Sequence, residues 1–235
     1  MAPHQTWMRS SRLVPLVAVI VGIAAVAFVL FQASDKEEAA KQQSDHGFAA
    51  VEQSEWEHRD PEDPMALGDV DAPVGLVVFS DFQCQYCAKW SHETLPELLK
   101  YVDDGKLRIE FREMNIFGAE SEQAARAAYS AGLQGKLREY HALLFPEGKH
   151  RPKNQLNDDA LADLASQAGL DVERFKTDYG SRRVLSAIRD KASDGFTAGT
   201  VSTPAFILAN QPILGAQPTS VFTDKIDSVL DASGN

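Results

Sequence analysis

Two cysteines separated by two residues are the side chains of this sequence with the clearest capacity for chemistry. Cys84 and Cys87 are the only cysteines among its 235 residues. A disulfide scaffold needs more cysteines spread along the chain, and a closed zinc site needs four ligands, whereas no second cysteine pair is present. His92 follows five positions after Cys87 and would face away from the pair on a helix. We therefore expect a reactive dithiol and no metal site.

The segments around the pair indicate how the chain positions it. Gly75 to Phe79 form a short apolar run, which predicts a buried strand. Residues 88–101 carry apolar side chains at helical spacing, and Pro96 should kink this helix. The first cysteine then lies at a helix N-terminus, where free N–H groups and the helix dipole favour a thiolate. We expect Cys84 to be the exposed sulfur of low pKa and Cys87 to be more buried.

The next part of the chain changes from strand to helical character. Residues 106–114 alternate apolar and charged side chains, which predicts a second strand. Residues 119–198 predict a block of helices. Four of their side chains are suited to cap helix N-termini, namely Ser121, Asn157, Asp171 and Ser181.

The C-terminal part returns to strands and ends in a helix. Residues 205–208 and 212–214 predict two strands joined by a turn that contains Asn210. Pro218 should begin an amphipathic helix. We expect one side of that helix to carry Val221, Phe222, Ile226 and Val229.

Several stretches resemble one known family over about residues 60–232. Residues 66–74 and 79–87 look like the entry and active-site segments of DsbA-like proteins, the exported thiol–disulfide oxidoreductases of the thioredoxin superfamily. The runs 124–128 and 203–206 resemble later segments of the same family. The cysteine segment is the most specific part of this resemblance.

The resemblance implies a thioredoxin-like α/β fold with a helical domain inserted between the two halves of its core. The core halves would be residues 65–118 and 199–235, and the inserted domain residues 119–198. It also implies a cis peptide bond before Pro204, packed opposite the cysteines. The residues that we expect to bind substrate are Thr203, Pro204, Gln85 and Tyr86.

Two departures from the family pattern affect the expected activity. The family often has a carboxylate six residues before the first cysteine, where this chain has Val78; the nearest acid is Asp81. The dipeptide Gln85-Tyr86 is neither Pro-His nor Gly-Pro, so one source of thiolate stabilisation is missing. We expect Cys84 to be activated, but less than in the strongest oxidants.

The implied function is oxidation of cysteine pairs in exported proteins, with electrons passed to a membrane redox partner and no cofactor. One alternative is a reductase or isomerase that runs in the opposite direction. Another is a chaperone or metal carrier without turnover, although a copper carrier should show an additional Met or His ligand near the pair. We expect His58, His92 and His141 to be solvated or structural, and Trp90 to lie in the core.

The N-terminal segment predicts where the enzyme acts. Residues 13–31 form an uncharged apolar run, close to the roughly 20 residues that cross a bilayer. The positive-inside rule places residues 1–12 in the cytoplasm and the later residues outside the cell membrane, as a single-pass protein. A cleaved signal peptide is the alternative, with a small-x-small pattern at residues 25–27. The polar residues 32–64 predict a flexible linker. The net charge of −11 argues against nucleic-acid binding.

Overall fold

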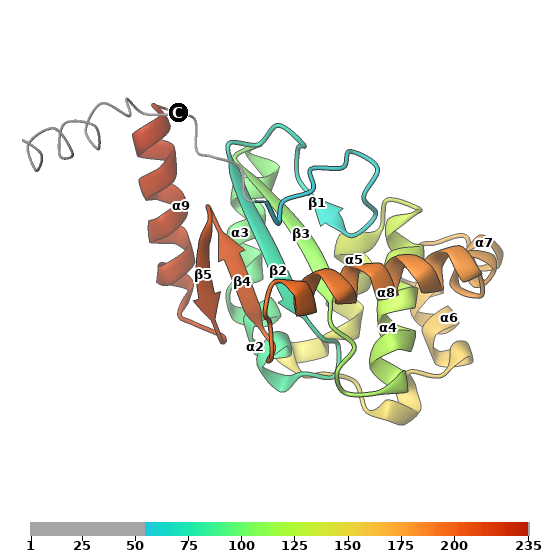
Figure 1. Cartoon of the computed structure of the whole chain (residues 1–235). Helices are drawn as coiled ribbons and strands as arrows, with labels where there is room; N and C mark the ends of the chain where they lie inside the picture. Colours follow the sequence, from blue (N-terminus) through green and yellow to red (C-terminus); the bar gives the residue numbers. More distant parts are fainter. Residues whose placement is uncertain (1–54, 235) are drawn as a thin grey trace, which may run out of the picture. The chain divides into compact units, whose positions relative to one another are not determined.

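The computed structural model describes residues 55–234, which form a five-stranded sheet with helices packed against it (Figure 1). Its strands are β1 (Ala66–Leu67), β2 (Val74–Ser80), β3 (Leu107–Glu113), β4 (Ala205–Leu208) and β5 (Gln211–Leu214). They lie in the order β1-β3-β2-β4-β5. Only β2 and β3 are parallel among these pairs, and the other neighbours are antiparallel. The strands predicted from the sequence are therefore confirmed.

The helices fall into two groups along the chain. Those flanking the cysteine segment and the C-terminus are α2 (Gln85–Glu93), α3 (Leu95–Asp103) and α9 (Thr219–Ser233). Those between β3 and β4 are α4 (Ala119–Gly132), α5 (Leu137–Leu144), α6 (Asp158–Gln167), α7 (Val172–Tyr179) and α8 (Arg182–Thr197), with short 3₁₀ turns η1 (Pro146–Gly148) and η2 (Lys153–Gln155). A helical insertion thus separates the two parts of the sheet, as predicted.

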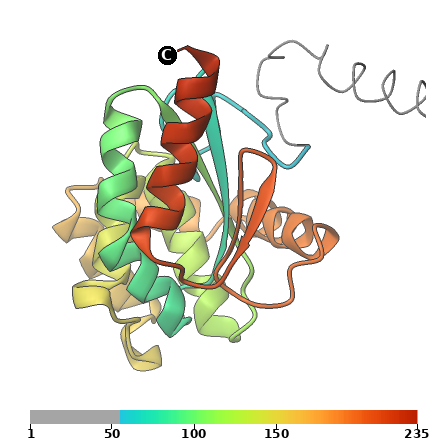
Figure 2. The ribbon, with the colours of Figure 1, turned by 90° about the vertical axis from the view of Figure 1, so that its left-hand side faces the viewer.

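The sheet separates two layers of helices (Figure 2), with α3 and α9 on one side and α8 on the other. Val78 of β2 faces the layer that also contains α2, whereas its neighbours Val77 and Phe79 pack on the α8 side. Gly195 allows α8 to approach the sheet closely. A Cβ atom at Gly195 would lie 2.1 Å from Sδ of Met114, so a larger residue would displace that side chain.

Three charged residues of β3, Arg108, Glu110 and Arg112, are buried under the α8 layer. Glu110 accepts hydrogen bonds from Nε of Arg108 (2.8 Å) and Nη2 of Arg112 (2.7 Å). Asp63 lies 3.4 Å from Nη1 of Arg112 and 2.7 Å from Nζ of Lys191, which extends the network to α8. Burial opposes the charge of Glu110, but the hydrogen bond from Arg108 and the charge of Arg112 lower its pKa to about 2.

Residues 57–63 belong to the folded domain, although they fall within the predicted linker. The backbone N–H groups of His58 and Arg59 donate to Glu110 at 3.0 and 2.8 Å. The Arg59 side chain donates to the carbonyl oxygens of Val70 and Ala72. The linker predicted for residues 32–64 is therefore too long at its C-terminal end, because charged residues in this segment are partners of the buried network.

Three of the four predicted N-caps are confirmed. The side chains of Asn157, Asp171 and Ser181 each accept a hydrogen bond from the N–H three residues later. The prediction for Ser121 is wrong, because α4 begins earlier, with Gly118 as its N-cap. Ser121 instead lies buried inside the helix and donates from Oγ to Asp81 at 2.7 Å.

Two details of the predicted helices differ from the structure. The helix expected at residues 88–101 is divided at Thr94, where Pro96 lies at the second position of α3. The chain thus forms two helices that meet at Thr94, which is a more complete break than the predicted kink. In α9, Phe222, Ile226 and Val229 are buried as expected. Val221 is not part of that face, since its side chain is 40% exposed.

No helix within residues 55–234 is long and apolar enough to cross a membrane. The predicted cytoplasmic segment 1–12, the predicted anchor 13–31 and most of the predicted linker lie outside the described residues.

Candidate active site

Cys84 is the N-cap residue of α2, at the end of the loop that leaves β2. Its backbone is extended (φ −87°, ψ 121°), and its Sγ accepts a hydrogen bond from the N–H of Cys87 at 3.3 Å. A sulfur in this position faces the free N–H groups of the helix, which favour negative charge there. Both cysteines are free thiols in this structure.

The loop before β4 meets the cysteine pair from the other half of the core. The peptide bond between Thr203 and Pro204 is cis, as the resemblance implied. In its thiol form, Sγ of Cys84 donates to the carbonyl oxygen of Thr203 at 3.3 Å. Pro204 is buried, and its own carbonyl accepts from the N–H of Gly215 at 2.9 Å. The chain therefore brings the predicted cysteine and proline segments together.

The two sulfurs have opposite acidities. A hydrogen bond from the Cys87 side chain and, in smaller part, one from the Thr203 side chain lower the pKa of Cys84 to about 6 against the opposing effect of burial. Burial raises the pKa of Cys87 well above its ordinary value, and the thiolate of Cys84 adds to this increase. Cys84 is thus the thiolate of the pair near neutral pH, and Cys87 is the thiol.

The prediction that Cys84 is exposed is wrong for this conformation. Its accessible surface is only 2% of the full value, and that of Cys87 is 1%. The cause is the Thr203–Pro204 loop, which contacts the sulfur directly. In this conformation the loop therefore limits access to the sulfur.

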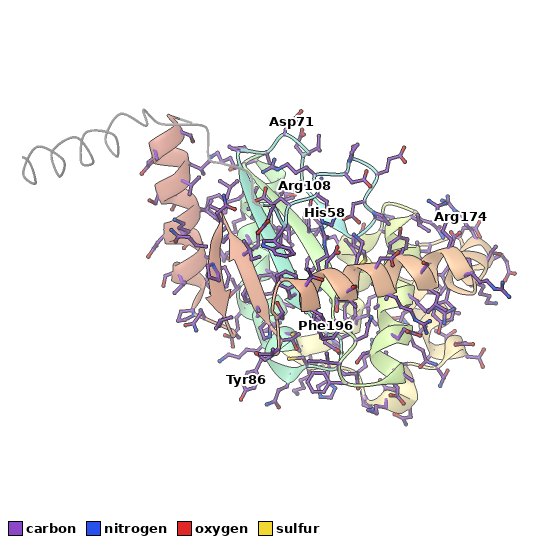
Figure 3. The ribbon with its side chains drawn as sticks, in the orientation of Figure 1. His58, Asp71, Tyr86, Arg108, Arg174 and Phe196 are labelled. Atoms are coloured by element: carbon purple, nitrogen blue, oxygen red, sulfur yellow. The ribbon has the colours of Figure 1, made fainter. Side chains whose placement is uncertain are left out.

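Gln85 and Tyr86 are both exposed at the start of α2. Tyr86 is 57% exposed and projects away from the ribbon, and Phe196 lies near the end of α8 (Figure 3). Other exposed apolar residues occur in two segments that border the site, namely Ile116, Phe117 and Val201. The sequence analysis did not find these residues, because isolated exposed apolar side chains in loops follow no periodic pattern.

Asp81 holds the active-site loop against the start of the helical insertion. Its carboxylate accepts hydrogen bonds from the N–H of Gln83 (2.8 Å), the N–H of Ile116 (2.7 Å) and the hydroxyl of Ser121 (2.7 Å). These bonds join the loop before the cysteines to the connection between β3 and α4. The nearest acid to the pair in sequence therefore has a structural role.

Glu113, the last residue of β3, is a buried carboxyl group that the sequence analysis did not single out. Both of its oxygens are buried without a hydrogen-bond partner among the described residues. Burial raises the pKa of Glu113 well above its ordinary value, and the negative charges of Asp81 and Cys84 add to the increase. The sequence did offer one indication of its position. Glu113 lies near the end of the predicted strand at residues 106–114, which belongs to the same sheet as the strand that leads to the cysteines.

The family model for thioredoxin matches residues 60–228. The chain belongs to the thioredoxin family. Among its relatives, a probable disulfide bond formation protein D from Bacillus anthracis is 29% identical over 135 residues, which cover 55% of this chain and 62% of that protein. The match thus spans less than two thirds of the length of that relative.

Solved structures of thioredoxin-family proteins share the fold. A thioredoxin-like oxidoreductase from Silicibacter pomeroyi DSS-3 is 28% identical, has a TM-score of 0.62, and matches 76% of this chain and 99% of its own. Oxidised BdbD from Bacillus subtilis is 21% identical, has a TM-score of 0.63, and matches 72% of this chain and 94% of its own. The predicted similarity to DsbA-like proteins is confirmed by the family model and by the disulfide bond formation protein. The match to BdbD, at 21% identity, supports the fold alone.

The remaining candidates lie in the core or at the surface of this thioredoxin-family protein. Trp90 packs in the core against the rings of Phe206 and Phe222. His58 and His92 are partly or fully exposed, whereas His141 is buried and its pKa is lowered to about 4 by burial. Within residues 55–234, no group of three or more His, Cys, Asp or Glu side chains could hold a metal ion.

Proposed function

We propose that the chain is a thiol–disulfide oxidoreductase that oxidises cysteine pairs in exported proteins through a Cys84–Cys87 disulfide. The observation that carries this proposal is the difference between the two sulfurs. Cys84, at the N-terminus of α2, has a pKa of about 6, whereas the pKa of the buried Cys87 is raised. A stabilised thiolate favours the reduced form of the pair and so makes its disulfide oxidising.

The reaction transfers two electrons from the client to the enzyme. A client thiolate attacks Sγ of Cys84, which breaks the enzyme disulfide and releases Cys87 as a thiolate that takes up a proton. A second client thiolate then attacks the client sulfur of the mixed disulfide. Cys84 leaves readily because its thiolate is stabilised. The client gains a disulfide, and the enzyme is left with the Cys84 thiolate and the Cys87 thiol.

The surface around Cys84 suits an unfolded client. Residues 200–204 lie outside the helices and strands, and Val201 is almost fully exposed. We propose that the backbone at Thr203 pairs with an extended client segment, which gives binding with little sequence preference. Tyr86 and Phe196 offer exposed aromatic rings for apolar client side chains. Gln85 is the exposed polar residue beside the cysteine.

The proposed location is the extracytoplasmic face of the cell membrane. The uncharged run at residues 13–31 supports a single-pass anchor, and the disulfide bond formation protein named among the relatives is consistent with an oxidising compartment. A membrane redox partner would restore the disulfide after each turnover. Alkaline extraction of cell membranes tests the anchor, because an anchored chain stays in the pellet and a cleaved one is released.

The reduction potential of the Cys84–Cys87 pair tests the direction of electron flow. The protein is equilibrated with glutathione buffers, and its redox state is measured by mass spectrometry after the thiols are alkylated. We expect a value toward about −120 mV, where strong oxidants lie. A value near about −270 mV, as in thioredoxin, would instead indicate a reductase.

Turnover on a reduced, unfolded client separates an enzyme from a binding module. The wild-type protein should form client disulfides catalytically when an oxidant regenerates it. The Cys84→Ser variant should be inactive, and a variant that kept full activity would contradict the assignment of Cys84. An isomerase would also act on a client with scrambled disulfides, which an oxidase should not correct efficiently.

A further inference from the structure

A cavity lies between the junction of α2 with α3 and the helix α5. Ser91 and His92, in the last turn of α2, line one part of it. Leu95 and Pro96, in the first turn of α3, line the next part. The division of the helix at Thr94 thus places two helix ends around one hollow. Its volume is about 300 Å³, at the lower end of the range for small-molecule sites.

The inner wall of the cavity is mainly apolar. Leu95 and Leu99 of α3 and Phe145, which follows α5, line it and are buried. Leu67 of β1 also lines it and packs against the same core. An apolar cavity of about 150 Å³ already binds benzene in a folded protein. The cavity therefore has room for a molecule with an aromatic ring, and the ring of Phe145 offers it a surface to pack against.

His141 of α5 brings a polar group to this apolar wall. Its side chain lines the cavity and is only 3% exposed. Its Nε2 is buried without a hydrogen-bond partner among the described residues. Buried polar atoms almost always have a partner, because leaving one unpaired is costly. An unpartnered nitrogen on a residue that lines a cavity of ligand size therefore indicates that a bound molecule supplies the partner.

The charges around the cavity are already paired, so its ligand should be neutral. Nη1 of Arg138, at the edge, lies 2.8 Å from Oδ1 of Asp103. The exposed Glu147, on the other side, lies 4.0 Å from Nζ of Lys149. Burial lowers the pKa of His141 to about 4, so its ring is neutral at pH 7. An ion that entered would lose its hydration without gaining an opposite charge.

A hydroxyl group is the polar group that best matches the ring of His141. A neutral imidazole has one nitrogen that donates a hydrogen bond and one that accepts. A hydroxyl group can serve either nitrogen, because it both donates and accepts. The match therefore holds for both tautomers of the histidine.

The cavity is separate from the surface that we propose for clients. No residue proposed to contact a client is among the described residues that line it. Its inner wall nevertheless adjoins the active-site loop. The ring of Phe82, two residues before Cys84, contacts the rings of His141 and Phe145, with centroids 5.4 and 5.2 Å apart. A molecule in the cavity would thus lie close to this loop and leave the client surface free.

We propose that this cavity binds a small neutral molecule that carries an aromatic ring and one hydroxyl group. The ring packs among Leu95, Leu99 and Phe145, and the hydroxyl group forms a hydrogen bond with Nε2 of His141. Binding makes and breaks no covalent bond. It is independent of disulfide exchange, so the inference stands or falls apart from the proposed function.

The probe is 4-fluorophenol, because it has this chemistry and a single fluorine nucleus to observe. The full-length protein in lipid nanodiscs is titrated with it, binding is followed by ¹⁹F NMR, and empty nanodiscs supply the blank. We expect saturable binding that is about twofold to tenfold tighter than that of fluorobenzene, the net effect of one hydrogen bond. The charged 4-fluorobenzoate should bind more weakly than 4-fluorophenol. A wild-type protein that does not bind 4-fluorophenol would overturn the proposal.

Ala142 allows the cavity to be closed from its surface side. Its side chain lines the cavity and is exposed on α5, so Ala142→Phe should fold and fill part of the space. We expect this variant to lose binding of 4-fluorophenol. The matched control is Ala232→Phe, at an exposed alanine of α9 outside the cavity lining, which should bind as the wild type does. Equal binding by Ala142→Phe and the wild type would place the probe elsewhere and contradict the proposal.

Two measurements test the role of His141. His141→Phe keeps a ring but removes both nitrogens, so the preference for 4-fluorophenol over fluorobenzene should disappear while fluorobenzene still binds. In the wild type, which needs no variant to fold, the ¹⁵N signals of the His141 ring should shift with 4-fluorophenol and much less with fluorobenzene. A preference that survives in His141→Phe, or ¹⁵N signals that ignore bound 4-fluorophenol, would refute the assignment of the hydroxyl group to His141.

Discussion

The hydrogen bond from Cys87 is the largest cause of the low pKa of Cys84, so its removal should raise that pKa. With a pKa of about 6, about nine-tenths of Cys84 is thiolate at pH 7. A cysteine at the model value of 9.0 is thiolate in only about one-hundredth of molecules at that pH. We expect Cys87→Ala to move the midpoint from about 6 toward 9. Cys87→Ser keeps a donor at this position and should retain part of the decrease.

The assay is the pH dependence of Cys84 alkylation by iodoacetamide, checked by the ultraviolet absorbance of the thiolate. The midpoint is the quantity to compare, because the nucleophilicity of a thiolate rises with its pKa and partly hides the effect on the rate at a single pH. Far-UV circular dichroism shows whether each variant is folded. The Cys84→Ser variant supplies the baseline without the reactive thiolate.

One result would refute the reasoning about this hydrogen bond. If Cys87→Ala and Cys87→Ser both titrate near the wild-type midpoint, the Cys87 thiol is not what stabilises the Cys84 thiolate. The N–H groups of α2 and the Thr203 side chain would then account for the low pKa. In that case Thr203→Val, rather than the Cys87 variants, should raise the midpoint.

Three further predictions concern the stability of the domain. Glu110→Gln should lower the free energy of unfolding in urea by about 3–5 kcal/mol, because it leaves buried arginines without their partner, whereas the exposed Glu139→Gln should change it by less than about 1 kcal/mol. Since the pKa of Glu110 is about 2 rather than 4.5, the wild type should lose this stability as the pH falls from 4.5 toward 2, and Glu110→Gln should lack that loss. Gly195→Ala should lower stability by about 1–3 kcal/mol in thermal unfolding, because the new Cβ displaces Met114. The wild type should also lose stability as the pH falls from 6.5 toward 4, because the buried His141 resists protonation and the unfolded chain binds that proton more readily. His141→Phe should remove this pH dependence. A pH dependence that persists in this variant would belong to another group.

The parts of the fold that depend on local sequence were predictable. The apolar run of β2 and the cysteines at the start of the following helix established the position of the reactive pair. Asn157, Asp171 and Ser181 indicated helix starts, because a capping side chain acts within three residues of itself. The insertion between β3 and β4 followed from the helical character of residues 119–198.

The features that were missed depend on contacts between distant segments. The alternating charges of β3 suggest a solvated face, yet residues 57–63 and α8 cover that face and pair with Arg108, Glu110 and Arg112. Ser121 is suited to cap a helix by its residue type, but Asp81 engages it from another part of the chain. Cys84 is hidden for the same reason, since the loop that covers it follows the whole insertion.

Both connections of the helical insertion to the core border the cysteine pair. The entry, after β3, is bonded through Ile116 to Asp81 in the loop before Cys84. The exit, after α8, continues into Thr203, whose carbonyl meets the sulfur. The segments that connect the inserted domain to the core are therefore the same segments that border the active site. A tilt of the insertion would therefore open or narrow the path to Cys84 without any change in the cysteine motif.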